Sequence, residues 1–304
     1  MVTPNKNLIV IVGPTAVGKT DIAIDLALAL NGEILSADSR QIYKELNIGT
    51  AKPINVQLEA VVHHFINSHS ITDRYTVFDY AREAHEILSD LHQRQRNAFL
   101  VGGSGLFVNA VVDGLDEFPE VATNIRQELN RELKQEGLQT LFEKLKQQDP
   151  VYAEVVDQNN PRRVIRALEI CRGTGKPFSS FLGKKAHAHN YSVNKIGLEI
   201  PREELYVNID KRVDTMINQG LVEEARGLYK FREIPAMRTV GYQELMEYFE
   251  DKVTLKEAIE KIKRNTRRYA KRQLTWFKKD ANIKWFQPTE RDQIMEYVKG
   301  AVGI

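Results

Sequence analysis

The first part of the chain alternates between short runs with the length of strands and longer segments whose apolar residues repeat as in a helix. Residues 8–12, 33–36 and 98–101 fit strands, and residues 21–30 and 77–95 fit helices. Such alternation is typical of a parallel sheet covered by helices. We therefore expect residues 1–119 to form the first part of an α/β core.

A different pattern begins near residue 120. Up to residue 182 the spacing is helical, the segment is rich in Gln, Glu, Lys and Arg, and it is broken at Gly137, Pro150, Pro161 and 173–177. Helix breakers at these positions predict several helices joined by turns. We interpret residues 120–194 as a helical insertion domain, with hinges at 113–119 and 183–194.

The chain is then expected to return to the core. Residues 196–200 fit a returning strand, and the remainder has helical spacing with breaks at Gly220, Pro235 and Gly241. Residues 195–304 would therefore complete the core and add C-terminal helices. The predicted fold class is an α/β protein with a P-loop NTPase-like parallel sheet, a mostly helical insertion domain and a helical C-terminal region.

Composition adds the cellular setting. The chain has 304 residues, of which 42% are hydrophobic and 28% are charged, as in an ordinary globular protein. No apolar run reaches the length of a membrane span, and no signal-peptide pattern is present at the start. The single cysteine, Cys171, falls in a predicted helix, where burial is the expected role. We expect a cytoplasmic protein with no membrane partner.

A glycine-rich loop joins the first predicted strand to the first predicted helix. It reads Gly13, Pro14, Thr15, Ala16, Val17, Gly18, Lys19 and Thr20. The G-x-x-x-x-G-K-[ST] pattern between a strand and a helix predicts a site for phosphate groups, bound by backbone N–H groups and the helix N-terminus. Lys19 adds a positive charge. The Thr20 hydroxyl suits a Mg²⁺ ion shared with the phosphates.

Two further loops follow predicted strands. Residues 36–41 contain Asp38, whose carboxylate would lie near the phosphate loop as a general base or a partner of magnesium; the alternative is a helix cap. Residues 102–105 contain Ser104 among three glycines. An NTP hydrolase normally has an Asp for magnesium after this strand, so its absence argues against a motor or switch ATPase.

Positive charge is concentrated near the C-terminus. Residues 261–279 contain nine Lys or Arg residues and no acidic residue. Such a helix fits a phosphate backbone, although a solvated basic helix is the alternative. The spacing of Ile259, Ile262, Tyr269 and Trp276 predicts that these four pack against the core, with the arginines on the other side.

Several longer segments occur together along the chain. They are GPTAVGKT, SADSRQIYKELNIGTAKP, the pair His63–His64, VGGSGLF, NNPRRVIRALEICRGTGKP, RTVGYQEL and TRRYAKRQLTWFKK. In this order, from about residue 9 to residue 277, they resemble tRNA dimethylallyltransferases, which are isopentenyl transferases acting on the adenosine directly 3′ of the anticodon. Eukaryotic relatives carry a C-terminal zinc finger that this sequence lacks, so the bacterial form is expected.

The resemblance implies a prenyl transfer. Dimethylallyl diphosphate would bind through the Gly13–Thr20 loop with Mg²⁺, and N6 of adenosine 37 would attack its allylic carbon. Asp38 would take the N6 proton, with Lys19, Thr15 and Ser104 as the other catalytic residues. The family favours tRNAs that read codons beginning with U. Because the target base lies in a stacked anticodon loop, it has to flip out, at a cost of a few kcal/mol.

The resemblance also implies a set of tRNA-binding residues for the anticodon stem-loop. The set is Asp38, Ser39, Arg40, Gln41, Ser104, Arg126, Arg162, Arg163, Val164, Ile165, Arg166 and Arg238. Three members depart from the family pattern, since Arg40 often corresponds to another residue, Arg162 replaces a usual Gln, and Ser104 a usual Thr. Ion pairing within the insertion, with Glu169, is the alternative role for its arginines.

Some alternatives remain open at this stage. An adenylate isopentenyltransferase would act on a free nucleotide, a P-loop small-molecule kinase would consume ATP, and a non-catalytic RNA-binding protein would keep only the basic surface. His63 and His64 are adjacent and have no third ligand nearby in sequence, so a structural role is expected rather than a metal site. We expect a monomer. The sequence leaves open the exact tRNA set, the order of substrate binding and the movement of the insertion.

Overall fold

The computed structural model describes residues 6–184 and 191–303, and the chain divides into two compact units. The larger unit is Met1–Val112 with His189–Ile304, and the smaller unit is Asp113–Ala188. The smaller unit occupies the region interpreted as the insertion. Strand β5 (Ser192–Leu198), however, begins inside the predicted 183–194 hinge, part of which lies outside the described residues.

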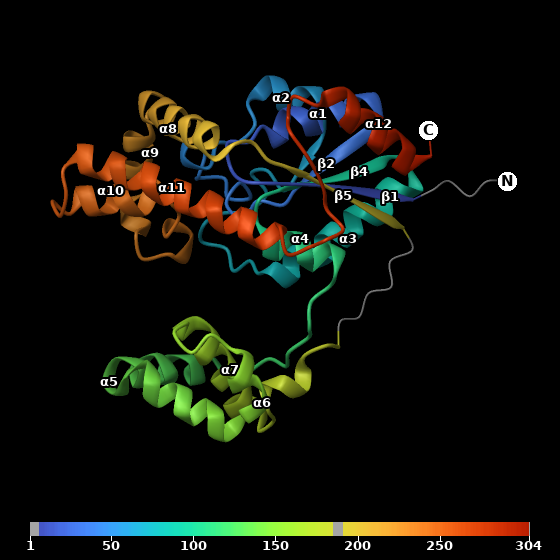
Figure 1. Ribbon diagram of the computed structural model, residues 1–304. Helices are drawn as coiled ribbons and strands as arrows, with labels where there is room; N and C mark the ends of the chain where they lie inside the picture. Colours follow the sequence, from blue (N-terminus) through green and yellow to red (C-terminus); the bar gives the residue numbers. More distant parts are fainter. Residues whose placement is uncertain (1–5, 185–190, 304) are drawn as a thin grey trace. The chain divides into compact units, whose positions relative to one another are not determined.

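The larger unit is built on a six-stranded parallel sheet (Figure 1). The strand order is β3-β2-β4-β1-β5-β6. The strands are β1 (Asn7–Val12), β2 (Gly32–Ser36), β3 (His63–His64), β4 (Asn97–Gly102), β5 and β6 (Lys284–Phe286). The expectation of a parallel sheet is confirmed. The expectation of helices alone after residue 200 is wrong at β6, because three residues are too few to show a strand pattern.

Helices cover the sheet and extend beyond it. They are α1 (Lys19–Ala29), α2 (Asn55–Ala60), α3 (Val77–Gln93), α4 (Gly105–Val112), α8 (Arg202–Asn218), α9 (Leu221–Gly227), α10 (Tyr242–Phe249), α11 (Leu255–Phe277) and α12 (Arg291–Val302). Short 3₁₀ segments are η1 (Ile48–Thr50), η3 (Tyr229–Phe231) and η4 (Pro235–Met237). The predicted breaks at Gly220, Pro235 and Gly241 are confirmed, since each lies where a helix or 3₁₀ segment begins.

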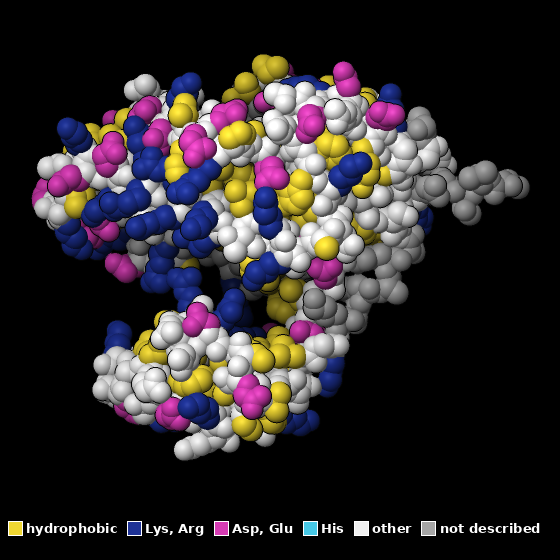
Figure 2. Space-filling model, in the orientation of Figure 1, with side chains coloured by type: hydrophobic (Ala, Val, Ile, Leu, Met, Phe, Trp, Pro, Cys, Tyr) yellow, Lys and Arg dark blue, Asp and Glu magenta, His cyan; other side chains and the backbone are white. Residues whose placement is uncertain are grey.

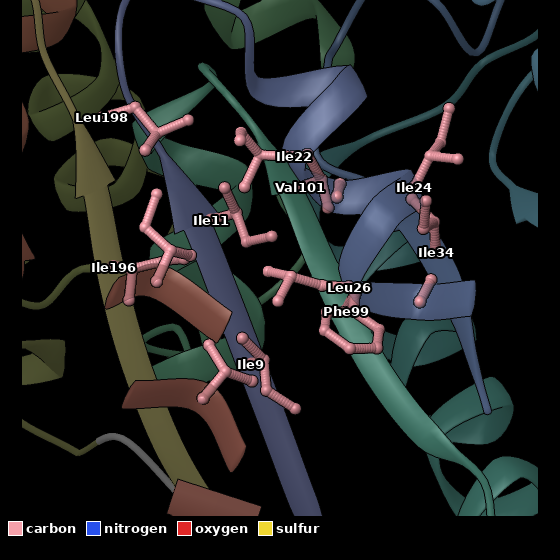
Figure 3. Packing of buried hydrophobic residues seen from close by; sticks show 14 of the residues in the cluster. Ile9, Ile11, Ile22, Ile24, Leu26, Ile34, Phe99, Val101, Ile196 and Leu198 are labelled. Carbon is pink, nitrogen blue, oxygen red and sulfur yellow. The ribbon is translucent and has the colours of Figure 1, made fainter. Parts of the chain in front are cut away.

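Both faces of the sheet are buried, and β1 shows how. Ile9 and Ile11 pack on one face with residues of α1, α8 and α12, as the close view in Figure 3 shows for Ile22 of α1. The alternate residues of β1 pack on the other face with α3 and α4. Because alternate side chains of a strand point to opposite faces, a continuous apolar run is the pattern of such a doubly covered strand.

A third apolar cluster carries the helices beyond the sheet. Leu221 of α9, Tyr242 and Leu245 of α10 and Ile262 of α11 are all nearly fully buried in it. Full burial of each apolar side chain contributes roughly 1.5–3 kcal/mol relative to exposure. This cluster therefore anchors the first part of α11, and α11 forms part of the wall of a cavity in this unit.

The smaller unit is helical. It contains α5 (Thr123–Gln148), α6 (Pro150–Val155), α7 (Pro161–Thr174) and the 3₁₀ segment η2 (Phe178–Phe181). The predicted breaks are confirmed: Gly137 interrupts α5 with φ 83°, and Pro150 and Pro161 begin helices. Cys171 is buried in the core of this unit, as expected. In the part of the chain that the structure describes, none of the helices combines the length and apolar character needed to span a bilayer.

Candidate active site

A cavity of about 710 Å³ lies in the larger unit, beside the carboxyl ends of β2 and β4. Its wall includes residues 15–16 and 18–20 of the phosphate loop, residues 38–41 of the second loop, and Gly102 and Gly103 of the third. Helices α8 and α11 contribute further residues. The volume is typical of a pocket for a small molecule. The three loops that the sequence singles out therefore meet at one cavity.

The phosphate loop connects β1 directly to α1. Gly13 has φ 149°, and a Cβ atom there would lie 2.5 Å from the Leu198 carbonyl oxygen, so a side chain does not fit. Lys19 Nζ donates hydrogen bonds to the carbonyl oxygens of Gly13 and Pro14, at 3.0 and 2.7 Å. Burial and, to a smaller degree, the charge of Arg212 lower the pKa of Lys19 to about 7, while Asp38 opposes the shift. A bound anion would favour the charged lysine.

Arg212 is a cavity residue that the sequence reasoning missed. It lies on α8, and Asn208 and Met216 lie on the same face of that helix and also line the cavity. Burial lowers the pKa of Arg212, while the Asp38 carboxylate opposes this shift. It forms no salt bridge with another described residue, so its guanidinium can serve a ligand phosphate. The only sequence signal is a cation at helical spacing, which many surface helices share.

Asp38 stabilises the turn that follows β2. Its Oδ1 accepts hydrogen bonds from the backbone N–H groups of Arg40 and Gln41, at 2.9 and 3.4 Å. Its Oδ2 is not used in this turn, and the residue lines the cavity. A carboxylate with one oxygen fixed by the backbone and the other available has the geometry of an oriented general base. The capping role and the role of a base are therefore compatible.

Ser104 lies behind the cavity wall rather than on it. Its Oγ accepts a hydrogen bond from the Ser39 backbone N–H at 3.0 Å and lies 3.2 Å from Ser39 Oγ. Ser39 itself lines the cavity. The structure thus shows the Ser104 hydroxyl holding Ser39 in place, and its contact with the substrate stays a prediction.

Tyr269 also departs from the sequence expectation. It was expected to pack in the core, but it is half-buried and lines the cavity. Burial, followed by the charge of Asp38, raises the pKa of Tyr269 to about 12, while a hydrogen bond with Ser104 partly opposes this increase. Tyr269 therefore presents a neutral hydroxyl near Asp38 and adds an aromatic ring to the cavity wall. An aromatic face in this place suits a planar base.

The Gln41 side chain is used within the protein. Its Nε2 donates to the carbonyl oxygens of Thr50 and Ala51, each at 3.2 Å, and its Oε1 accepts from Ser36 Oγ at 3.2 Å. These bonds hold the η1 segment against the loop that contains Asp38. Arg40 and Arg238 are also on the cavity wall, so the structure brings both predicted tRNA-binding arginines of the larger unit to this cavity.

The remaining predicted tRNA-binding residues lie in the smaller unit. Arg126, Arg162 and Arg163 are exposed. Arg166 pairs with the buried Glu169 at 3.0 Å, and Arg126 lies 4.0 Å from the same carboxylate. The alternative role of ion pairing within the insertion is therefore observed for Arg166 and Arg126, whereas Arg162 and Arg163 form no salt bridge with a described residue.

Two members of that predicted set face the other way. Val164 and Ile165 are nearly fully buried in the core of the smaller unit. Their side chains are therefore not exposed for an RNA contact, and their assignment as tRNA-binding residues stays a prediction. Arg162 and Arg163, just before them on α7, present their side chains to solvent.

Helix α11 has one basic face and one buried face. Three cations of the helix, and Lys278 directly after it, form salt bridges with acidic residues. The pairs are Lys261–Glu247, Lys263–Asp214, Arg267–Asp210 and Lys278–Glu199. Among the described residues, Arg264, Arg268, Lys271 and Arg272 form no salt bridge. Figure 2 shows Lys and Arg side chains gathered over this region. Trp276 is 41% exposed, so its predicted core position is wrong, and Phe277 is buried instead.

The donor atoms at the cavity fit magnesium better than a transition metal. The Thr20 hydroxyl lies on the cavity wall, and hard oxygen ligands with water and phosphate oxygens are what Mg²⁺ prefers. Within the described ranges there is no cluster of three His, Cys, Asp or Glu residues that could hold a metal ion. His64 Nε2 instead lies 2.8 Å from Glu33 Oε2, a carboxylate that Arg94 also contacts.

Sequence comparison gives a consistent family match. The family model described as IPP transferase matches residues 41–280. A protein of Christiangramia forsetii named tRNA dimethylallyltransferase is 50% identical over 296 residues, which are 97% of this chain and 98% of that protein. A protein of Flavobacterium johnsoniae with the same name is 46% identical over 300 residues, which are 96% and 97% of the two chains.

Solved structures agree with the sequence matches. A tRNA isopentenylpyrophosphate transferase from Bacillus halodurans has a TM-score of 0.73 and 39% identity, and the match covers 98% of this chain and 97% of that one. A eukaryotic dimethylallyltransferase acting on tRNA has a TM-score of 0.82 and 25% identity, over 97% and 80%. The fold, the cavity and these matches define a prenyl transferase with a P-loop-like core. The chain belongs to the IPP transferase family.

Proposed function

We propose that the chain transfers a dimethylallyl group from dimethylallyl diphosphate to N6 of adenosine 37 in tRNAs that read codons beginning with U. The products are N6-isopentenyladenosine and diphosphate. The names of the similar proteins support the reaction class. The observation that carries the proposal for this chain is the cavity that the phosphate loop and the oriented Asp38 carboxylate both line.

The donor would bind by its diphosphate. Lys19 would exchange its bonds to the carbonyls of Gly13 and Pro14 for phosphate oxygens, and the half-buried Arg212 would add a second cation. The Thr20 hydroxyl and the phosphate oxygens would hold Mg²⁺, which when bound neutralises charge on the leaving group. As the allylic C–O bond breaks, the diphosphate gains negative charge. Two cations and the loop amides stabilise that charge.

The acceptor would be activated by Asp38. The N6 amine forms the new C–N bond and passes one proton to the carboxylate, so that the product amine is neutral. Tyr269 offers an aromatic face for the flipped adenine, which costs a few kcal/mol to extrude from the anticodon loop. Phosphate contacts from the basic residues of α11 and from Arg162 and Arg163 would offset that cost.

The test is mass spectrometry of an RNA anticodon stem-loop after incubation with dimethylallyl diphosphate and Mg²⁺. The expected product is heavier by one isopentenyl group at the adenosine 3′ of the anticodon. Faster prenylation of free AMP would favour the adenylate isopentenyltransferase alternative. Phosphorylation of a small molecule from ATP without a prenyl donor would favour a kinase. Binding of RNA without turnover would favour the non-catalytic alternative.

Three further expectations belong to this proposal. We expect EDTA to abolish transfer and added Mg²⁺ to restore it, because the diphosphate needs charge neutralisation. We expect a monomer, which sedimentation or gel filtration tests, and a cytoplasmic location, which fractionation of cells tests.

A further inference from the structure

Helix α11 contains one buried polar side chain close to its exposed cations. Gln273 is 6% exposed, whereas Lys271 and Arg272, directly before it, are exposed. A buried amide requires hydrogen-bond partners, because an unsatisfied one costs about 1–3 kcal/mol. Gln273 finds its partners in two loops that are distant in sequence.

The two bonds of the Gln273 amide connect α11 to both loops. Its Oε1 accepts a hydrogen bond from the Thr15 backbone N–H at 2.9 Å, and its Nε2 donates to the Gly103 carbonyl oxygen at 3.0 Å. The orientation of the amide is unambiguous, since a backbone N–H can only donate and a carbonyl oxygen can only accept. Gln273 therefore connects the phosphate loop, the loop after β4 and the basic helix.

The Gln273 amide packs tightly against the backbone of the loop after β4. A Cβ atom on Gly103 would lie 2.0 Å from Gln273 Nε2, so only glycine allows the approach. The Thr15 N–H is used by Gln273, which fixes the tip of the phosphate loop to the helix. A shift of α11 along its axis must therefore move Thr15 or break a buried hydrogen bond.

We infer that Gln273 is a positioning residue that couples RNA binding on α11 to diphosphate binding in the phosphate loop. The inference rests on the proposed function, because it takes RNA as the ligand of the basic face. RNA that restricts the position of α11 also restricts the position of Thr15. The phosphate loop then loses less conformational entropy when the anion binds. Coupling between two sites is reciprocal and typically changes each affinity about 5- to 150-fold.

The experiment measures binding without turnover. The dissociation constant of inorganic diphosphate with Mg²⁺ is determined by calorimetry, with and without a saturating RNA anticodon stem-loop, and the RNA affinity is determined with and without diphosphate. Wild type is expected to bind each ligand at least about fivefold more tightly when the other is present. The coupling ratio is the affinity for one ligand in the presence of the other divided by the affinity in its absence. Gln273→Met, which keeps the length of the side chain and removes both hydrogen bonds, is expected to bring this ratio close to one.

Three other variants separate coupling from general damage. Gln273→Glu keeps the bond from Thr15 but has no donor for Gly103, and a reduced ratio is expected; it also serves if the methionine variant does not fold. Gln293→Met, the same change at an exposed position of α12, should leave the ratio unchanged. Lys271→Ala should weaken RNA binding and keep the ratio, because it removes a charge and not the connection.

Two results would overturn the inference. One is a wild-type ratio of one, and the other is an unchanged ratio in folded Gln273 variants whose melting temperature is close to that of wild type. Both can occur in an enzyme that still transfers the dimethylallyl group. A failure of the coupling is therefore distinguishable from a failure of the proposed function, which the mass of the RNA product decides.

Discussion

The substitution Asp38→Asn separates two roles that one side chain combines. The asparagine Oδ1 can still accept the hydrogen bonds from Arg40 and Gln41, so that the turn after β2 is kept. The other oxygen becomes an NH₂ group, which cannot take the N6 proton. Asp38→Ala, in contrast, removes the base and the turn together, and a loss of activity in that variant would have two explanations.

The expected size of the effect follows from the role. A positioned general base contributes about 10²- to 10⁴-fold in rate, which corresponds to roughly 3–5 kcal/mol in the barrier. Diphosphate affinity should stay the same or increase, because the negative charge of Asp38 acts on Lys19 and Arg212 and opposes an added anion. RNA affinity should change by no more than about 10- to 100-fold, since at most one hydrogen bond to the charged carboxylate is altered.

The assay is single-turnover prenylation of an anticodon stem-loop at saturating donor, followed by mass spectrometry or radioactivity. Asp157→Asn is a matched control: Asp157 Oδ1 also accepts a backbone bond two residues on, from Asn159 at 3.0 Å, and the residue is exposed on the smaller unit. That control should keep the wild-type rate. A rate for Asp38→Asn within about threefold of wild type would refute the role of Asp38 as base.

Four further predictions concern other residues. Arg212→Met should weaken inorganic diphosphate binding about 10- to 100-fold by calorimetry, because a charged hydrogen-bond donor on the cavity wall is lost. Diphosphate binding at pH 8 should take up a proton on Lys19, whose free pKa is about 7 and rises beside the anion, so affinity falls as the pH increases above 7. Arg163→Ala should lower the slope of log affinity for RNA against log salt by about 1. Gly102→Ala should destabilise the fold by about 1–3 kcal/mol and reduce turnover, because its Cβ would lie 2.1 Å from the Ala37 carbonyl oxygen, next to Asp38.

Each of these predictions has a control variant or a result that would contradict it. Lys19→Arg keeps a charge and should show less proton uptake than wild type; equal uptake would place the titration elsewhere. Gly227→Ala meets no atom within 4 Å and should not destabilise the protein. Arg166→Ala should reduce the salt slope less than Arg163→Ala does, because Glu169 already neutralises its charge. An unchanged diphosphate affinity in Arg212→Met would show that the guanidinium is not a ligand.

Local sequence was sufficient to predict those features that depend only on residues near one another in the chain. The glycine-rich loop, the continuous apolar run of β1 and the helix breaks at Gly137, Pro150 and Pro161 all depend on backbone geometry or strand burial within a few residues. The same holds for Asp38, whose turn is closed by residues two and three positions further on. These features could therefore be predicted before any long-range contact was known.

Tertiary contacts decided what the local pattern leaves ambiguous. Helical spacing identifies which residues share a face of α11, but not which face meets the cavity, the core or solvent. Tyr269 therefore lies at the cavity, Trp276 is exposed, and Gln273 is buried. Gln273 bonds to loops 170 and 258 residues earlier in the chain, Arg212 acts on the phosphate loop from a distant helix, and no local pattern indicates such pairings.

The sequence by itself thus determined the phosphate loop, the parallel core and, through its resemblance, the family. Only the tertiary structure decided which cations stand beside the loop and which polar side chain connects it to the basic helix. The physical reason is that burial and hydrogen bonding between distant segments depend on how the helices pack on the sheet. Local spacing constrains that packing only weakly.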